Sequence, residues 1–193
     1  LSVQTALTFS LFFLLGSLVL SYAFFSLSFF MCCTAYILLN ILYTSYLKTL
    51  VIVDVLCISI GFVLRIMAGI FVIGSRLSPW ILVCAALLAL FMALIKRRHE
   101  LVLLGENAAS HRASLADYSI PFLDQMIASV TSSTLLAYAL YSFSSQTAQQ
   151  THALIFSLPF VIYGLFRYLY LCYQKNQGGE PETLVVSDKP FLI

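Results

Sequence analysis

The sequence predicts an all-α fold, a polytopic membrane bundle with six transmembrane helices. Of the 193 residues, 61% are hydrophobic and only 9% are charged, whereas average proteins carry about 25% charged residues. Residues 1–47 contain no Asp, Glu, Lys, Arg or His. Helices satisfy their backbone hydrogen bonds within the bilayer, so apolar runs of this length indicate helical spans. The composition excludes a disordered chain, a disulfide scaffold and a nucleic-acid-binding module.

The first uncharged run is long enough for two crossings. As one helix, 47 residues would extend about 70 Å, more than twice the ~30 Å thickness of the hydrocarbon core. Polar residues between positions 21 and 28 mark the turn. The run therefore predicts spans over Ala6–Leu20 and Phe25–Leu42.

Four further apolar runs each have the length of one crossing. Gly74 closes the third span, and Pro79 suits the first turn of the fourth. Residues 96–124 are predicted to form a cytoplasmic loop, and residues 174–193 a cytoplasmic loop or tail of the same single domain, 1–193. The four spans are Val51–Ile73, Pro79–Ile95, Met126–Phe143 and Ala153–Tyr173.

The basic residues predict the orientation. Seven lie on one side of the spans, Arg76 lies alone on the other, and two lie within spans. Because Lys and Arg are in excess on the cytoplasmic side of membrane proteins, both chain ends are expected in the cytoplasm. The seven are Lys48, Lys96, Arg97, Arg98, Arg112, Lys175 and Lys189.

Arg65 lies about 21 Å into the third span, at 1.5 Å per residue. An arginine at the centre of a span costs about 2.5–3.5 kcal/mol on the insertion scale. Asp54, Gly61 and Gly69 share one helical stripe with it, and small residues permit close helix contact. Arg65 is either an anion-binding residue that faces a bundle cavity or a structural residue bonded to carbonyls of a neighbouring helix.

Three more charged residues lie near predicted membrane edges. Asp54, about 5 Å deep, is either a functional carboxylate or a solvated or capping one. Lys48 is a candidate phosphate contact or a ligand for anionic lipid headgroups. Arg167 is a substrate-binding candidate or a cation that extends to the headgroups within an aromatic belt.

The densest charge cluster, Lys96-Arg-Arg-His-Glu100, follows the fourth span directly. If the helix continues, Lys96 and Glu100 form an i,i+4 pair, and Arg97 and Arg98 point elsewhere. The cluster is either a stop-transfer signal or a phosphate-binding site. Four apolar residues follow it, which favours a helix that packs along the protein.

Four segments together resemble the UbiA superfamily of intramembrane transferases, and most closely its decaprenyl-phosphate phosphoribosyltransferase branch. They are Tyr43–Lys48, Asp54 with Gly61–Arg65, Lys96–Leu101 and Phe166–Tyr170. The resemblance implies a bundle of about nine helices, of which this chain holds the third to the eighth, and a bacterial-type inner membrane. It also implies that the chain is a fragment of a longer protein.

The resemblance implies Mg²⁺ as cofactor, but the family's first aspartate-rich motif, Asn-Asp-x-x-Asp-x-x-x-Asp, is absent here. Those carboxylates would be the main ligands, so no metal ligand and no catalytic residue is assigned in this chain. The fragment alone is therefore expected to be inactive. Lys96, Arg97 and Arg98 occupy the position of the family's second aspartate-rich loop. Because cations replace carboxylates there, the loop is expected to bind a phosphate monoester rather than a second Mg²⁺.

The implied reaction moves 5-phosphoribose from phosphoribosyl diphosphate to a polyprenyl phosphate, for a precursor of cell-envelope polysaccharide. Its partners are those two substrates and membrane lipid. One alternative is a UbiA-type prenyltransferase that acts on an aromatic acceptor, and another is a transporter or lipid-binding bundle. The substrate-binding candidates are Lys48, Asp54, Arg65, Lys96, Arg97, Arg98, Glu100 and Arg167.

Overall fold

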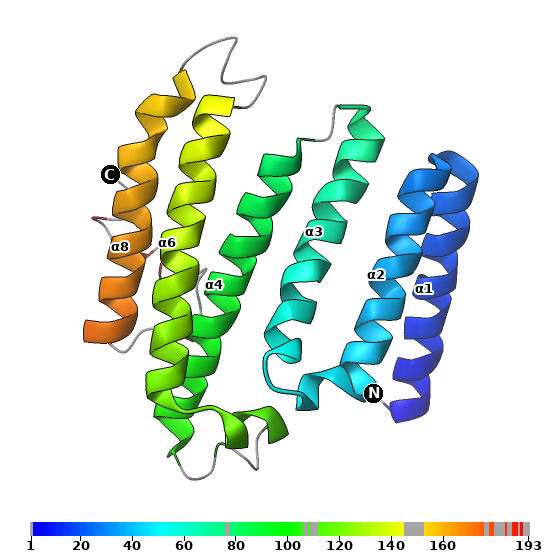
Figure 1. The fold of residues 1–193 in the computed structure, drawn as a ribbon. Coiled ribbons are helices and arrows are strands. Elements are labelled where there is room, and N and C mark those ends of the chain that lie inside the picture. Colours follow the sequence, from blue (N-terminus) through cyan, green and yellow to red (C-terminus); the bar gives the residue numbers. More distant parts are fainter. Residues whose placement is uncertain are drawn as a thin grey trace.

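Six long helices stand side by side in one row (Figure 1). The computed structural model describes residues 2–75, 78–105, 108, 112–144, 153–175, 178–179, 184, 187–188 and 190. Within these residues every regular element is helical, and six helices are long and apolar enough to cross a membrane, which confirms the predicted fold class. The first five are α1 (Val3–Phe24), α2 (Leu27–Ser45), α3 (Val53–Ile73), α4 (Pro79–Leu104) and α6 (Ile120–Ser144). The sixth, Leu154–Gln174, consists of α8 (Leu158–Gln174) and the short helical turn before it.

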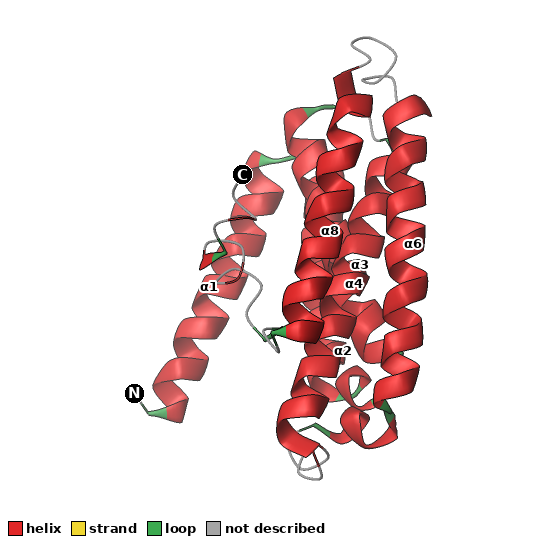
Figure 2. Ribbon diagram, turned by 90° about the vertical axis from the view of Figure 1, so that its left-hand side faces the viewer, coloured by secondary structure: helices red, strands yellow, loops and turns green. Residues whose placement is uncertain are grey.

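The first uncharged run contains two helices, as its length predicts. The turn lies at Phe25 and Ser26, where the hydroxyl of Ser26 accepts a hydrogen bond from the Phe29 amide and caps α2. Figure 2 shows α1 leaning away from the other helices, and α2 is the helix that it contacts.

Helix α4 is longer than the sequence predicts. It begins at Pro79, as expected, but continues past Ile95 to Leu104. Helix α6 likewise begins at Ile120, before the expected Met126. The predicted loop over residues 96–124 is therefore a shorter connection between two long helices. Arg97, Arg98, Glu100 and Asp124 form ion pairs within the bundle, so the helices do not end at the last apolar residue.

Short 3₁₀ helices lie beside the long helices at three junctions. Helix η1 (Leu47–Thr49) follows α2, η3 (Ala113–Asp117) precedes α6, and η4 (Ala153–Ser157) leads into α8. Helices η1 and η3 contact each other at the end of the bundle where α2 ends and α3 begins (Figure 1, bottom). The same end holds the last turns of α4.

The core lies between α4, α6, α8 and the first turns of α3. Its most deeply buried side chains include Val55, Phe91, Leu94, Leu123 and Ile127. The ring centres of Phe91 and of Tyr168 in α8 are 5.8 Å apart. In contrast, α1 and α2 bury one side chain each. Without water between lipid-exposed helices, close packing of side chains stabilises such a core.

Phe91→Ala is expected to lower the free energy of unfolding by about 3 kcal/mol, because the cavity that it leaves sits among packed rings and aliphatic side chains. Unfolding in mixed micelles measures this. Phe160→Ala is the matched control, because the Phe160 side chain is 71% exposed; its unfolding free energy should stay close to that of the wild type. Equal losses in both variants would contradict this core.

Candidate functional site

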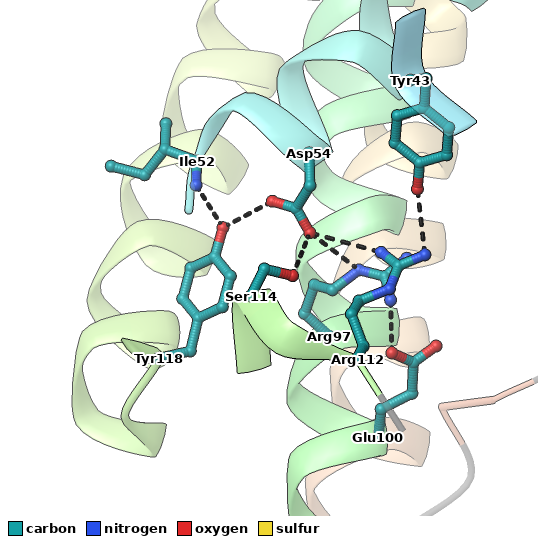
Figure 3. Close-up of polar contacts among 8 residues, drawn as sticks. All are labelled: Tyr43, Ile52, Asp54, Arg97, Glu100, Arg112, Ser114 and Tyr118. Atoms are coloured by element: carbon teal, nitrogen blue, oxygen red, sulfur yellow. Dashed lines mark hydrogen bonds and ion pairs between the residues drawn. The ribbon is translucent and has the colours of Figure 1, made fainter. Parts of the chain in front are cut away.

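Asp54 is the centre of a polar cluster at the end of the bundle (Figure 3). It lies in the first turn of α3, and its side chain is fully buried. The alternative of a solvated carboxylate is therefore wrong. The N-terminus of α3 stabilises the negative charge, but a carboxylate removed from water also requires hydrogen bonds and opposite charges.

Four side chains from other segments converge on this carboxylate. Oδ1 accepts a hydrogen bond from the Tyr118 hydroxyl at 2.9 Å. Oδ2 accepts from Ser114 Oγ at 3.3 Å and from Arg112 Nη1 at 3.4 Å, and it lies 3.6 Å from Arg97 Nε. Three of the four belong to the connection between α4 and α6. Asp54 thus attaches this connection to the start of α3.

Tyr118 bridges Asp54 and a strained residue. Its hydroxyl accepts a hydrogen bond from the Ile52 amide at 2.7 Å while it donates to Asp54. Ile52 has a φ of +68°, a left-handed conformation that is unusual for a β-branched side chain. Burial raises the pKa of the Tyr118 phenol well above its usual value, and the nearby Asp54 charge adds to the increase. Tyr118 therefore remains a donor at neutral pH.

Arg97 is enclosed by the cluster, with only 3% of its side chain exposed. One of its terminal nitrogens donates to Glu100, and within the described residues its buried Nε makes no hydrogen bond. The predicted pair of Lys96 with Glu100 is wrong, because Glu100 pairs with Arg97 one turn away. Arg97 and Arg112 therefore face two carboxylates, and their charges balance.

Arg112 is the main residue that sequence reasoning missed. Its Nη2 donates to the Tyr43 hydroxyl at 3.0 Å, which ties the α4–α6 connection to the end of α2. At 22% exposure it is the more accessible guanidinium of the cluster. Ser114 and Tyr118 were missed as well. Their signal in the sequence is weak: three polar residues in a short connection, with no spacing typical of a site.

Arg98 belongs to a different group of contacts, between α4, α6 and α8. Its Nε donates to Asp124 at 2.6 Å, and its guanidinium lies 4.0 Å from the centre of the Tyr173 ring. The Tyr173 hydroxyl also donates to Asp124. Asp124 and Tyr173 line a groove of about 420 Å³ between α6 and α8. Arg97 and Arg98 thus point to different sites, because consecutive residues on a helix lie about 100° apart.

The remaining predicted residues are dispersed. Lys48 in η1 and Lys96 in α4 are exposed. Arg65 donates to the Tyr36 hydroxyl of α2 rather than to helix carbonyls, and it lines a cavity between α2 and α3. Arg167 donates two hydrogen bonds to Asp188, at 2.8 and 2.9 Å. It is therefore held by the C-terminal segment, and the pKa of the Asp188 carboxyl is lowered by those bonds.

The described part of the chain contains no ligand set that fits the expected Mg²⁺. No group of three His, Cys, Asp or Glu side chains lies close enough together there to hold a metal ion. The carboxylates of Asp54 and Glu100 each face a guanidinium, and opposite charges at this distance compete with a cation. The described residues therefore do not fit Mg²⁺.

Asp54→Asn is expected to lower the free energy of unfolding by about 3 kcal/mol, because it leaves the buried Arg97 and the half-buried Arg112 with one carboxylate between them. Unfolding in mixed micelles measures the loss. Asp117→Asn, in the same connection but exposed, provides the control and should change little. A wild-type unfolding free energy for Asp54→Asn would show that the cluster contributes nothing to stability.

Tyr118→Phe is expected to lower the free energy of unfolding by about 1–3 kcal/mol, because the Ile52 amide and Asp54 each lose a buried partner. Since the pKa of Tyr118 is raised on folding, its contribution is complete below the ordinary phenol pKa of about 10 and is lost as the pH rises above it. The difference between variant and wild type should therefore shrink at alkaline pH. Tyr46→Phe, at an exposed tyrosine, serves as the control.

Comparison with known proteins gives one consistent result. The chain matches the UbiA prenyltransferase family over residues 1–185. It is 33% identical over 161 residues to a decaprenyl-phosphate phosphoribosyltransferase of Corynebacterium glutamicum, covering 82% of this chain and 48% of the relative. Proteins of the same name from Mycolicibacterium smegmatis and Mycobacterium tuberculosis are 29% and 27% identical, each over 82% of this chain and 52% of the relative.

The chain thus spans about half the length of the curated relatives that it matches. The family match covers nearly the whole chain, and the resemblance seen in the sequence is confirmed. Together with the six apolar helices, it makes this chain part of an integral, multi-pass membrane protein. The chain belongs to the UbiA prenyltransferase family.

Proposed function

We propose that the protein transfers 5-phosphoribose from phosphoribosyl diphosphate to a polyprenyl phosphate at the cytoplasmic face of a bacterial inner membrane. The names of its relatives support the phosphoribosyl and polyprenyl phosphate parts of this proposal. The observation that carries it is the convergence of Arg97 and Arg112 on Asp54 at the end of the bundle where Lys48 and Lys96 are also exposed. Arg97 and Arg112 are balanced by carboxylates, but Arg112, Lys48 and Lys96 retain exposed surface at this end, and phosphorylated substrates require such accessible cations.

In the proposed reaction, an oxygen of the acceptor phosphate attacks C1 of the ribose, and the bond from C1 to the diphosphate breaks. The diphosphate leaves with the electron pair of that bond. No proton is needed from the protein, because the acceptor phosphate is already an anionic nucleophile. The protein contributes positions and fixed charges, which stabilise the charge that develops on the leaving group.

The residues have different exposures, which suggests different tasks. Arg112 and Lys96 retain exposed surface, so they are the proposed phosphate contacts. Arg98 is paired with Asp124 in the separate group of contacts between α4, α6 and α8. Arg97 is a positioning residue in this proposal, since two carboxylates enclose it. Asp54 and Glu100 orient the two guanidinium groups of the cluster. Mg²⁺, if it supports the leaving group, takes its main ligands from outside this chain.

The proposal is tested with the full-length membrane protein in detergent, by measuring diphosphate release. Release is expected with phosphoribosyl diphosphate and a polyprenyl phosphate together, and not when a prenyl diphosphate and an aromatic acceptor replace them. The opposite preference would establish the prenyltransferase alternative. No diphosphate release with either pair, in the presence of Mg²⁺, would favour the transporter or lipid-binding alternative.

Arg112→Ala is expected to raise the KM for phosphoribosyl diphosphate about tenfold or more, because a charge-assisted hydrogen bond to phosphate is lost. Lys175→Ala removes an exposed cation at the end of α8 and is the matched control, with an unchanged KM. Steady-state kinetics in detergent measure both. A wild-type KM in Arg112→Ala would remove this residue from the donor site.

A further inference from the structure

A cavity of about 130 Å³ lies between α2 and α3. Tyr36 and the exposed Arg65 form one end of it, and Tyr43 forms the end nearest to the Asp54 cluster. Gly61 and Asn40 lie between them. We call this cavity the α2–α3 cleft; its lining consists of Tyr36, Leu39, Asn40, Tyr43, Cys57, Ile58, Gly61, Phe62 and Arg65.

The charge of Arg65 is not neutralised by the residues around it. Its guanidinium donates to the Tyr36 hydroxyl and lies 4.8 Å and 5.4 Å from the ring centres of Tyr36 and Phe62. All these partners are neutral. Among the ion pairs of the described residues, none includes Arg65. Four of the guanidinium groups elsewhere in the described chain do have a carboxylate partner.

The lack of a carboxylate partner is unusual for an arginine at the position of Arg65 in the helix. It lies twelve residues after Val53, the start of α3, and hence about 18 Å along the helix at 1.5 Å per residue. That is near the middle of a hydrocarbon core of about 30 Å. A cation at this depth without a carboxylate requires an anion or water, and such residues mark the paths of substrates through membrane proteins.

We propose that the α2–α3 cleft binds the phosphate of a single-chain lipid phosphate, with Arg65 as its charged ligand. The donor groups are the Arg65 guanidinium, the hydroxyls of Tyr36 and Tyr43, and the Asn40 amide. A guanidinium binds phosphate through two parallel hydrogen bonds. The identity of this lipid as the acceptor rests on the proposed function, whereas the anion site itself does not.

The surroundings of the cleft favour a lipid over a soluble phosphate. Phe62 lines the cleft and is exposed, and Leu38, Leu42 and Ile60 are exposed on the same two helices. An apolar chain bound there would meet apolar side chains. The cleft is small, about 130 Å³, which favours a phosphate with one apolar chain over the branched glycerol unit of a two-chain phospholipid.

The cleft also lies at the right place to deliver a nucleophile. Asp54 and Arg65 are eleven residues apart, or about 16 Å along α3, so the cleft and the Asp54 cluster are separate sites. Tyr43 connects them, because its ring lines the cleft while its hydroxyl binds Arg112. A lipid phosphate that moves from Arg65 toward Tyr43 would reach the proposed donor site.

Binding of farnesyl phosphate to the full-length protein in detergent tests the site. In Arg65→Gln the dissociation constant is expected to rise about tenfold or more, because the charged ligand is lost. Gly61→Leu should have a similar effect by filling the cleft: a Cβ at Gly61 would lie 3.6 Å from the Tyr36 ring, so the rest of the side chain extends into the cavity. Each variant provides an independent test should the other fail to fold.

Gly69→Leu is the matched control, because the space around Gly69 on the same helix is open; it should bind farnesyl phosphate as the wild type does. Farnesol and inorganic phosphate should each bind at least tenfold more weakly than farnesyl phosphate, since farnesol lacks the phosphate and inorganic phosphate lacks the apolar chain. Wild-type affinity in both Arg65→Gln and Gly61→Leu would overturn the proposal. Equal binding of farnesol, of inorganic phosphate or of a two-chain phosphatidate would also overturn it.

The same variants separate this proposal from the proposed function. Gly61→Leu should leave the affinity for phosphoribosyl diphosphate unchanged, because the Asp54 cluster is intact. If farnesyl phosphate binds through Arg65 but no phosphoribosyl transfer occurs, the lipid phosphate site stands and the proposed function fails. If transfer occurs with wild-type kinetics in both cleft variants, the proposed function stands and the cleft proposal fails.

Discussion

The buried carboxylate of Asp54 organises one end of this bundle. Removing a carboxylate from water is costly, so it persists only where opposite charges and hydrogen bonds surround it. Here the partners come from α4 and from the connection that follows it, two segments far from Asp54 in the chain. Their convergence determines where the connection lies, and the strained backbone of Ile52 persists because Tyr118 holds it in the same network.

The need to pair charges also explains how the arginines are distributed. Arg97 faces Asp54 and Glu100, Arg98 faces Asp124, and Arg167 faces Asp188. The described residues therefore do not form a single cavity lined by all the cations. Consecutive residues on a helix point about 100° apart, so Arg97 and Arg98 serve different neighbours. What remains accessible is a smaller set of cations, and these carry the proposed phosphate contacts.

The two proposed substrate sites, the Asp54 cluster and the α2–α3 cleft, lie in different environments. The Asp54 cluster lies where the chain leaves the span, within reach of a soluble sugar phosphate. The α2–α3 cleft lies deeper and is flanked by exposed apolar side chains. A transferase that joins a soluble donor to a lipid acceptor requires two such environments in contact, and Tyr43 lies at their boundary.

The sequence by itself determined the fold class, the number of spans and the identity of several charged candidates. Continuous apolar runs leave the chain few alternatives, because an unpaired backbone is costly in a bilayer. Local patterns also located the turn near Ser26 and the start of α4 at Pro79. The resemblance to the family was equally visible in short motifs, since these depend on residue identity alone. The burial of Asp54, the role of Arg112 and the continuation of α4 past Ile95 were decided only by the tertiary structure. They arise from charge pairs between residues up to 58 positions apart, and no local spacing in the chain encodes which carboxylate a given guanidinium will meet.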